Sequence, residues 1–284
     1  MIQFGASMVS WIANWTAASG RYAIGKAAAA GFDLIEISLP GDLDLGMDIQ
    51  ELKADLAEAG IDVRFSLILP QELHMPFYPE KALVHLKKAI DLVKEAGGSS
   101  LVGVLYTAIG VFTGAPCTDS ERNTVIAVLT DACSYAAEGG IWLALEPINR
   151  YESYVLNGAE QTLDLIKEVD KDNLRLMLDS FHMNIEESNY YEPVIKAADK
   201  LNYLHIASSD RGMPGLDNVN WDELFKGLAE IKYSGALVLE NFSSEVEALR
   251  GPTSLWRTSK YGADDLARGG LHFIKEKAYQ YGLY

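Results

Sequence analysis

The chain has few cysteines, few positive charges and no long apolar run. Its 284 residues include only two cysteines, Cys117 and Cys133, at a spacing that matches no paired metal ligands and predicts no disulfide framework. No apolar run reaches the roughly 18 residues that a membrane span needs. The first residues, "MIQFGASMVSWIANW", lack the basic segment and cleavage pattern of a signal peptide. We therefore expect a soluble, cytoplasmic protein that does not bind membranes.

The shortage of positive charge also restricts the partners. There are 24 lysines and arginines against 40 aspartates and glutamates, which gives a formal net charge of −16. A chain of this charge repels phosphate backbones and anionic lipids, so we expect no general binding to nucleic acid. A small molecule is the more suitable ligand class.

Short β-rich runs alternate with longer amphipathic stretches along the whole chain. The runs lack the polar–apolar alternation of a half-exposed sheet, which favours parallel strands buried on both faces. The predicted strands cover residues 2–7, 33–39, 62–69, 100–107, 141–148, 174–180, 201–208 and 236–242. The clearest helical patterns cover residues 48–60, 80–98 and 160–170. Gly60, Gly97 and Gly139 follow helical patterns, where we expect left-handed C-caps.

Eight strands and about eight helices predict a closed α/β barrel of the (β/α)8 TIM type. We expect a single domain over residues 1–284, with C-terminal helices from about residue 245. A doubly wound open sheet is the rival arrangement. It would predict a glycine-rich phosphate loop after the first strand, and "GASMVSW" is not one.

Four consecutive predicted strands end on residues that can bind a metal ion. These residues are Glu146, Asp179, His205 and Glu240. The carboxyl ends of the strands carry the chemistry in such barrels, so the four side chains should meet at one rim. Three carboxylates at close range need a compensating charge, which a divalent cation would supply. Oxygen donors with one imidazole suit Mn²⁺, Mg²⁺ or Co²⁺, and we predict one ion per chain, most simply Mn²⁺.

Other polar side chains follow these strand ends closely. Glu152 comes six residues after Glu146, His182 three after Asp179, and Arg211 six after His205. A carboxylate, an imidazole and a guanidinium beside a metal ion could hold a polyhydroxylated substrate. Without the metal site, Arg211 could equally be a surface loop charge or an ion-pair partner of Asp210, and Glu152 a solvated loop acid.

The segments "LEPINRYESYVLN", "MLDSFHMNIEE", "LHIASSDRGMPG" and "LVLENF" resemble the D-tagatose/D-psicose 3-epimerase family, within the xylose-isomerase-like sugar isomerases and epimerases. The likeness is densest from residue 141 to residue 242. It implies that the four strand-end residues bind the metal and that Glu146 and Glu240 form the acid–base pair. It also implies a homodimer or homotetramer. The resemblance assigns substrate contacts to Glu152, His182, Arg211, Trp15 and Phe242.

Three positions depart from the family pattern. The third predicted strand ends "SLILP" where relatives carry a glycine-rich segment, Ser7 stands where an aromatic residue is common, and "TAIGVFTG" lacks a tryptophan. These positions would contact the distal part of the sugar, from C4 to C6. The reaction type is therefore better specified than the substrate.

We expect a metal-dependent enzyme that inverts C3 of free 2-ketoses through a cis-enediolate, with two glutamates as acid and base. The candidate substrates are tagatose, psicose or fructose, and ribulose or xylulose. An aldose–ketose isomerase or another sugar or sugar-phosphate isomerase on the same barrel is the nearest alternative, and a dehydratase of cyclic polyols is another. A non-catalytic sugar-binding protein and an endonuclease IV-like DNA repair enzyme belong to different classes. The net charge disfavours the latter.

Overall fold

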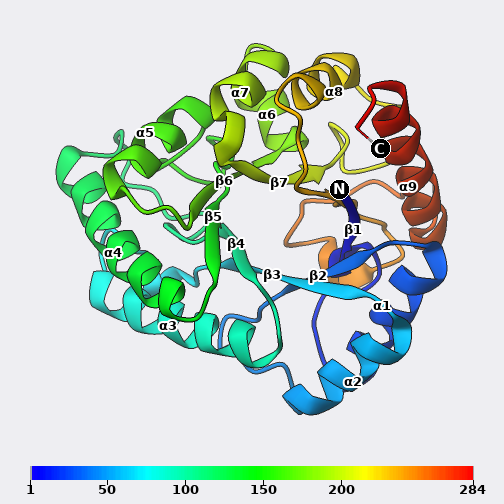
Figure 1. Cartoon of the computed structure of the whole chain (residues 1–284), viewed down its shortest axis with the longest axis horizontal. Helices are drawn as coiled ribbons and strands as arrows, with labels where there is room; N and C mark the ends of the chain where they lie inside the picture. Colours follow the sequence, from blue (N-terminus) through cyan, green and yellow to red (C-terminus); the bar gives the residue numbers. More distant parts are fainter. Residues whose placement is uncertain (1, 284) are drawn as a thin grey trace.

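The computed structural model describes residues 2–283 and shows eight parallel strands that close into a barrel in chain order. Figure 1 shows the helices outside the strands, where they form a ring. The strands are β1 (Gln3–Ser7), β2 (Leu34–Ser38), β3 (Asp62–Ile68), β4 (Ser100–Val104), β5 (Trp142–Leu145), β6 (Leu174–Asp179), β7 (Leu201–Ile206) and β8 (Ala236–Leu239). The predicted single-domain (β/α)8 barrel is confirmed, and the open sheet is wrong.

The described part of the chain contains nine α-helices, where we expected about eight. They are α1 (Ala17–Ala30), α2 (Ile49–Ala59), α3 (Pro79–Glu95), α4 (Asp119–Glu138), α5 (Ala159–Val169), α6 (Ser180–Glu186), α7 (Tyr191–Ala197), α8 (Trp221–Glu230) and α9 (Ala263–Gln280). The extra helix arises because both α6 and α7 follow β6. No helix in residues 2–283 is long and apolar enough to cross a membrane.

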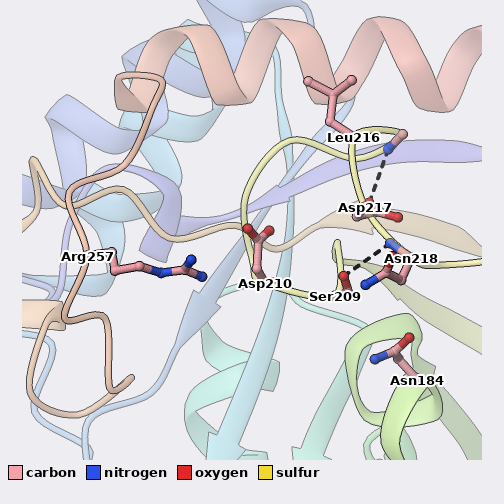
Figure 2. Close-up of a pocket in the computed structure, with 8 residues that line it drawn as sticks. Asn184, Ser209, Asp210, Leu216, Asp217, Asn218 and Arg257 are labelled. Carbon is pink, nitrogen blue, oxygen red and sulfur yellow. Dashed lines mark hydrogen bonds between the residues drawn. The ribbon is translucent and has the colours of Figure 1, made fainter.

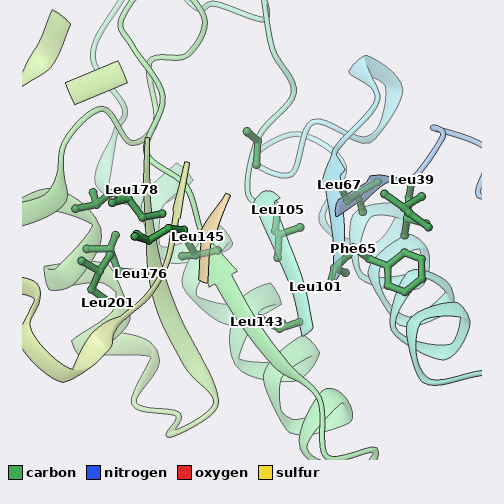
Figure 3. Packing of buried hydrophobic residues seen from close by; sticks show 14 of the residues in the cluster. Leu39, Phe65, Leu67, Leu101, Leu105, Leu143, Leu145, Leu176, Leu178 and Leu201 are labelled. Atoms are coloured by element: carbon green, nitrogen blue, oxygen red, sulfur yellow. The ribbon is translucent and has the colours of Figure 1, made fainter. Parts of the chain in front are cut away.

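The strands have two apolar faces, as the sequence pattern predicts. The outer face packs against the helices, and Figure 3 shows part of this layer, including Leu143 and Leu145 of β5 and Leu176 and Leu178 of β6. The inner face forms a smaller separate cluster inside the barrel, made of Leu34, Val102, Ala144, Met177, Tyr203, Ala236 and Val238. Because side chains alternate along a strand, the inner cluster determines which later residues point into the barrel mouth.

One of the three expected left-handed helix caps is wrong. Gly60 and Gly97 adopt left-handed conformations with φ of 65° and 81°, as expected, but Gly139 has φ of −91°. The left-handed residue after α4 is Gly140, with φ of 70°, because the helix continues to Glu138 and the reversal comes one residue later. At the C-terminal end, the first helical turn after β8 is the 3₁₀ turn Glu247–Leu249. Residues 243–262 form a loop with one short 3₁₀ turn, and α9 starts at Ala263.

Candidate active site at the carboxyl end of the barrel

The four predicted metal-binding residues come together because each lies two positions after a side chain of the inner cluster. The inner residues are Ala144, Met177, Tyr203 and Val238, and the residues that follow them are Glu146, Asp179, His205 and Glu240. Glu146 and Glu240 each lie one residue beyond the end of β5 and β8, because both strands are shorter than predicted. The strand pairing still extends to them, since Glu146 N donates to Gly103 O and Glu240 N to Ile206 O.

The distances between these side chains are those of a metal-ligand set. His205 Nδ1 lies 3.3 Å from Glu240 Oε2, 3.7 Å from Glu146 Oε1 and 3.9 Å from Asp179 Oδ2. Around an ion with bonds of about 2.1 Å, ligand atoms stand about 3 Å apart when adjacent and about 4 Å when opposite. The three separations from His205 Nδ1 are therefore of the size expected for ligands of one divalent ion, and Asp179, His205 and Glu240 lie close enough to share one.

Asp179 serves two purposes with its two oxygens. Oδ1 accepts a hydrogen bond of 2.7 Å from Phe181 N and caps the N-terminus of α6. Oδ2 points into the cluster, where neither it nor His205 Nδ1 has a hydrogen-bond partner of good geometry among the described residues. Two buried polar atoms that face a common centre without a well-formed hydrogen bond favour a cation at that centre.

Arg211 is the positive charge that the chain itself brings to this centre. Its Nη1 lies 2.8 Å from Asp179 Oδ2 and also contacts Glu240. The guanidinium stacks between Phe181 and Phe242, with its central carbon 4.3 Å and 5.1 Å from the two ring centroids. The backbone of Arg211 is left-handed, with φ of 60°, and its carbonyl accepts a hydrogen bond from Phe242 N. Aromatic stacking and this unusual backbone conformation together direct the guanidinium at the carboxylates.

The burial of these groups changes their proton affinities in different directions. Burial raises the pKa of Glu146 well above its usual range, and the charges of Asp179 and Glu240 add to the rise. Burial alone would also raise the pKa of Glu240, but Arg211 and His205 outweigh it and hold that pKa below the ordinary value. Burial would lower the pKa of His205, but the neighbouring carboxylates of Glu36 and Glu240 raise it well above the ordinary value. The two glutamates assigned to acid–base chemistry thus have pKa values shifted in opposite directions.

His182 is oriented as a hydrogen-bond donor to this centre. Its Nδ1 faces two donors of Asn149, the backbone N at 3.2 Å and the side-chain amide Nδ2 at 2.9 Å. Burial, with the charge of Arg211, lowers the pKa of His182 well below the ordinary value. The neutral ring then carries its hydrogen on Nε2, which lies 4.0 Å from Glu146 Oε1 and 3.8 Å from Asp179 Oδ2. Glu146, Asp179 and His182 also lie close enough to share an ion, but a protonated Nε2 has no lone pair to offer.

Asn149 also connects His182 to Glu152. Its amide Nδ2 donates to Glu152 Oε1 at 2.8 Å, so one buried asparagine orients both predicted substrate contacts. We had not singled out Asn149, although it lies within "EPINRYESY". Its role depends on the contact of this loop with His182 of α6, 33 residues further along the chain.

Trp15 lies in the core. It is 5% exposed, its ring packs against Gly20 of α1, and its Nε1 donates to the sulfur of Met47. These contacts account for its position without a ligand. Its contact with a sugar stays a prediction.

The end of β3 presents an apolar side chain to the mouth of the barrel. Ser66 Oγ reaches Glu36 inside the barrel, so Ile68, two residues later, lies on the same face of the strand. Ile68 is 51% exposed. The region that we expected to contact the distal end of a sugar therefore has an apolar surface at β3.

A cavity of about 540 Å³ lies beside the loop after β7. Figure 2 shows Arg257, from the loop before α9, directed towards Asp210 across this cavity, with Asn184 of α6 on another side. None of the four strand-end ligands lines it. It is separate from the metal-ligand set.

Comparison with known proteins places this site in a family. The model of the xylose isomerase-like TIM barrel family matches residues 24–277. An L-ribulose 3-epimerase from Methylomonas sp. (strain DH-1) is 36% identical over 97% of this chain and 98% of its own length. A ketose 3-epimerase from Arthrobacter globiformis is 33% identical over 97% of this chain and 96% of its own.

A solved structure matches equally well. The crystal structure of a D-allulose 3-epimerase from Methylomonas sp. in complex with D-allulose is 36% identical, covers 97% of both chains and has a TM-score of 0.91. Sequence and structure therefore agree over nearly the full length. The chain belongs to the xylose isomerase-like TIM barrel family.

Proposed function

We propose that the protein is a metal-dependent ketose 3-epimerase acting on free 2-ketoses of the ribulose and psicose type. The observation that carries the proposal is that Glu146 and Glu240 both lie within 4 Å of His205 Nδ1 but come from different sides. They follow β5 and β8, which β6 and β7 separate in the barrel. The names of the ribulose and ketose 3-epimerase relatives support the same reaction.

Glu146, Asp179, His205 and Glu240 would hold the ion: Asp179, His205 and Glu240 lie close enough to share one, and Glu146 Oε1 lies 3.7 Å from His205 Nδ1. Mn²⁺, Co²⁺ or Mg²⁺ suits this donor set. When bound, a divalent ion supplies Lewis-acid polarisation of the ketose oxygens, which makes the C3 hydrogen more acidic. The lack of a well-formed hydrogen bond at Asp179 Oδ2 and His205 Nδ1 favours this assignment. The fit concerns the donor set and does not depend on which of the three ions is used.

Inversion at C3 needs one group to remove a proton and another to deliver one from the opposite face. Glu146 and Glu240 can do this because they approach the centre from β5 and β8. For one epimer Glu146 takes the proton and Glu240 returns one, and for the other epimer the roles exchange. Each such transfer contributes roughly 10²–10⁴-fold to the rate.

The remaining polar groups would hold the oxygens near C1 to C3. His182 offers its Nε2 hydrogen, Arg211 its guanidinium hydrogens, and Glu152 a carboxylate that Asn149 fixes in place. Fixed donors lower the entropic cost of placing C3 between the two glutamates. Phe242 helps indirectly in this scheme, because it stacks on Arg211.

At the distal end, the exposed Ile68 favours an uncharged sugar tail. No lysine or arginine occurs in residues 69–78 or 105–118, which follow β3 and β4. A terminal phosphate would find no positive charge in these segments. We also propose that the protein is cytoplasmic. The family resemblance implies that it assembles as a homodimer or homotetramer.

The experiment that tests the reaction is a product analysis. The purified protein, loaded with Mn²⁺, is incubated with D-psicose, D-tagatose, L-ribulose and D-xylulose, and the products are separated by chromatography. We expect only C3 epimers of each ketose. Aldoses as the main products would identify an aldose–ketose isomerase, and no conversion of any ketose would refute an epimerase.

A further inference from the structure

Glu36 is a buried carboxylate that reaches across the barrel to the proposed metal ligand His205. It lies on β2, two residues after Leu34 of the inner cluster, and is 1% exposed. Its Oε2 lies 2.8 Å from His205 Nε2 on β7. Because β1 and β8 separate β2 from β7, this contact crosses the interior of the barrel.

The other partners of Glu36 fix the direction of this hydrogen bond. Tyr203 OH donates to Oε2 at 2.7 Å, and Ser66 Oγ donates to Oε1 at 3.0 Å. The carboxylate thus accepts from two hydroxyls on β7 and β3, and the remaining partner must also donate. His205 Nε2 therefore carries a hydrogen, and Nδ1 is the nitrogen that can release its proton and offer a lone pair to an ion.

His205 Nδ1 faces the carboxylate cluster. His205 Nδ1 lies 3.3 Å from Glu240 Oε2 and has no hydrogen-bond partner of good geometry among the described residues. Histidines that bind metals commonly donate their other ring nitrogen to a carboxylate, which fixes the ring and makes the ligand nitrogen more basic. Glu36, His205 and the ion position would form such a chain.

We propose that Glu36 is a positioning residue that acts through His205: it holds the imidazole with its hydrogen on Nε2 and so strengthens metal binding at Nδ1. The proposal rests on the proposed function, because it requires His205 to bind the ion. Glu36 itself does not contact substrate or metal. Two other roles have to be distinguished from this one. Glu36 could only stabilise the fold, or it could act only as a negative charge that attracts any cation.

A double-mutant cycle separates these roles. The Mn²⁺ dissociation constant is measured by calorimetric titration for the wild type, Glu36→Ala, His205→Ala and the double variant. We expect Glu36→Ala to weaken binding about 10- to 100-fold and to have no further effect when His205 is already absent. Glu121→Ala is the matched control, because Glu121 is also a hydrogen-bonded carboxylate but lies at the start of α4. It should leave Mn²⁺ affinity unchanged.

Thermal unfolding gives a second test, because a purely structural role of Glu36 would not change how much Mn²⁺ raises the melting temperature. The rise in melting temperature on adding Mn²⁺ should shrink in Glu36→Ala, whatever the stability of the metal-free variant. If Glu36→Ala does not fold, Glu36→Gln keeps the size of the side chain and should weaken binding about 10-fold.

The proposal is overturned if both Glu36 variants bind Mn²⁺ as the wild type does, or if Glu36→Ala weakens binding equally with and without His205. Equal weakening with and without His205 would mean that Glu36 acts only through its negative charge and not through His205. If the wild type binds no Mn²⁺, or if His205→Ala binds it as tightly, the metal site of the proposed function is itself wrong.

Discussion

Replacing Asp179 with asparagine should stabilise the metal-free protein and at the same time remove its response to metal. The side chain is 1% exposed, and burial raises its pKa from 3.8 to about 6, with Glu240 adding to the rise and Arg211 opposing it. A carboxyl whose pKa is raised in the folded state destabilises the fold once the pH exceeds the unfolded value. The lost stability reaches its full size above the pKa of the folded state, so at pH 8 it amounts to about 3 kcal/mol.

Asparagine removes that cost without removing the helix cap. Its Oδ1 can still accept from Phe181 N, as Asp179 Oδ1 does at 2.7 Å. A gain of about 3 kcal/mol would raise the melting temperature of the metal-free protein by on the order of 5 °C at pH 8. The anionic ligand is lost, however, so the further rise that Mn²⁺ gives to the wild type should largely disappear.

The assay is thermal unfolding at pH 8 and pH 5, with chelator and with Mn²⁺. Asp48→Asn is the control, because Asp48 caps α2 through an equal 2.7 Å bond from Gln50 N but is exposed and distant in sequence from the cluster. Asp48→Asn should change neither the melting temperature of the metal-free protein nor its rise on adding Mn²⁺. An Asp179→Asn variant that melts lower than the wild type without metal, and still gains as much from Mn²⁺, would refute the reasoning.

Three further outcomes follow from the site. Mn²⁺ affinity, measured by titration from about pH 6 to about pH 9, should rise with pH. The pKa values of Glu146 and His205 are both raised, so their protons compete with the ion. An affinity that does not change with pH would contradict this. Glu240→Gln should slow epimerisation at least about 100-fold yet keep weakened Mn²⁺ binding, with residual C3 exchange for one epimer only, and Glu146→Gln should favour the other epimer. The kcat/KM for a ketose phosphate should stay below ten times that of the free ketose, since no positive charge occurs in the segments after β3 and β4.

The barrel was predictable because its strands are continuous apolar runs. All eight predicted runs contain a strand, but most strands end one to three residues earlier than predicted. The difference is physical: residues such as Ser180 and Thr107 continue the apolar pattern only in part and belong to helix or loop. The four predicted ligands nevertheless lie within one residue of their strand ends. Each points into the barrel because side chains alternate along a strand and the residue two positions earlier is an inward-facing apolar one.

Glu36 shows what the local pattern does not contain. It is a single acidic residue in the apolar run of β2, and its partners Tyr203 and His205 lie 167 and 169 residues away in the chain. Their contact depends on closure of the barrel, which brings the inner faces of β2 and β7 together. Asn149 was missed for a different reason, since its importance depends on the orientation of one loop relative to α6.

Trp15 was assigned to the sugar pocket by resemblance alone, and its packing against Gly20 is a contact that no sequence pattern specifies.

The central claim is that two glutamates exchange the C3 hydrogen of a ketose with solvent from opposite faces. It is tested most directly by running the reaction in D₂O and locating deuterium in the product by NMR. The account predicts deuterium at C3 of the epimerised product and none at C1. Label at C1 with none at C3 would contradict it and indicate aldose–ketose isomerisation, and an epimer formed without any label would contradict proton exchange through the glutamates.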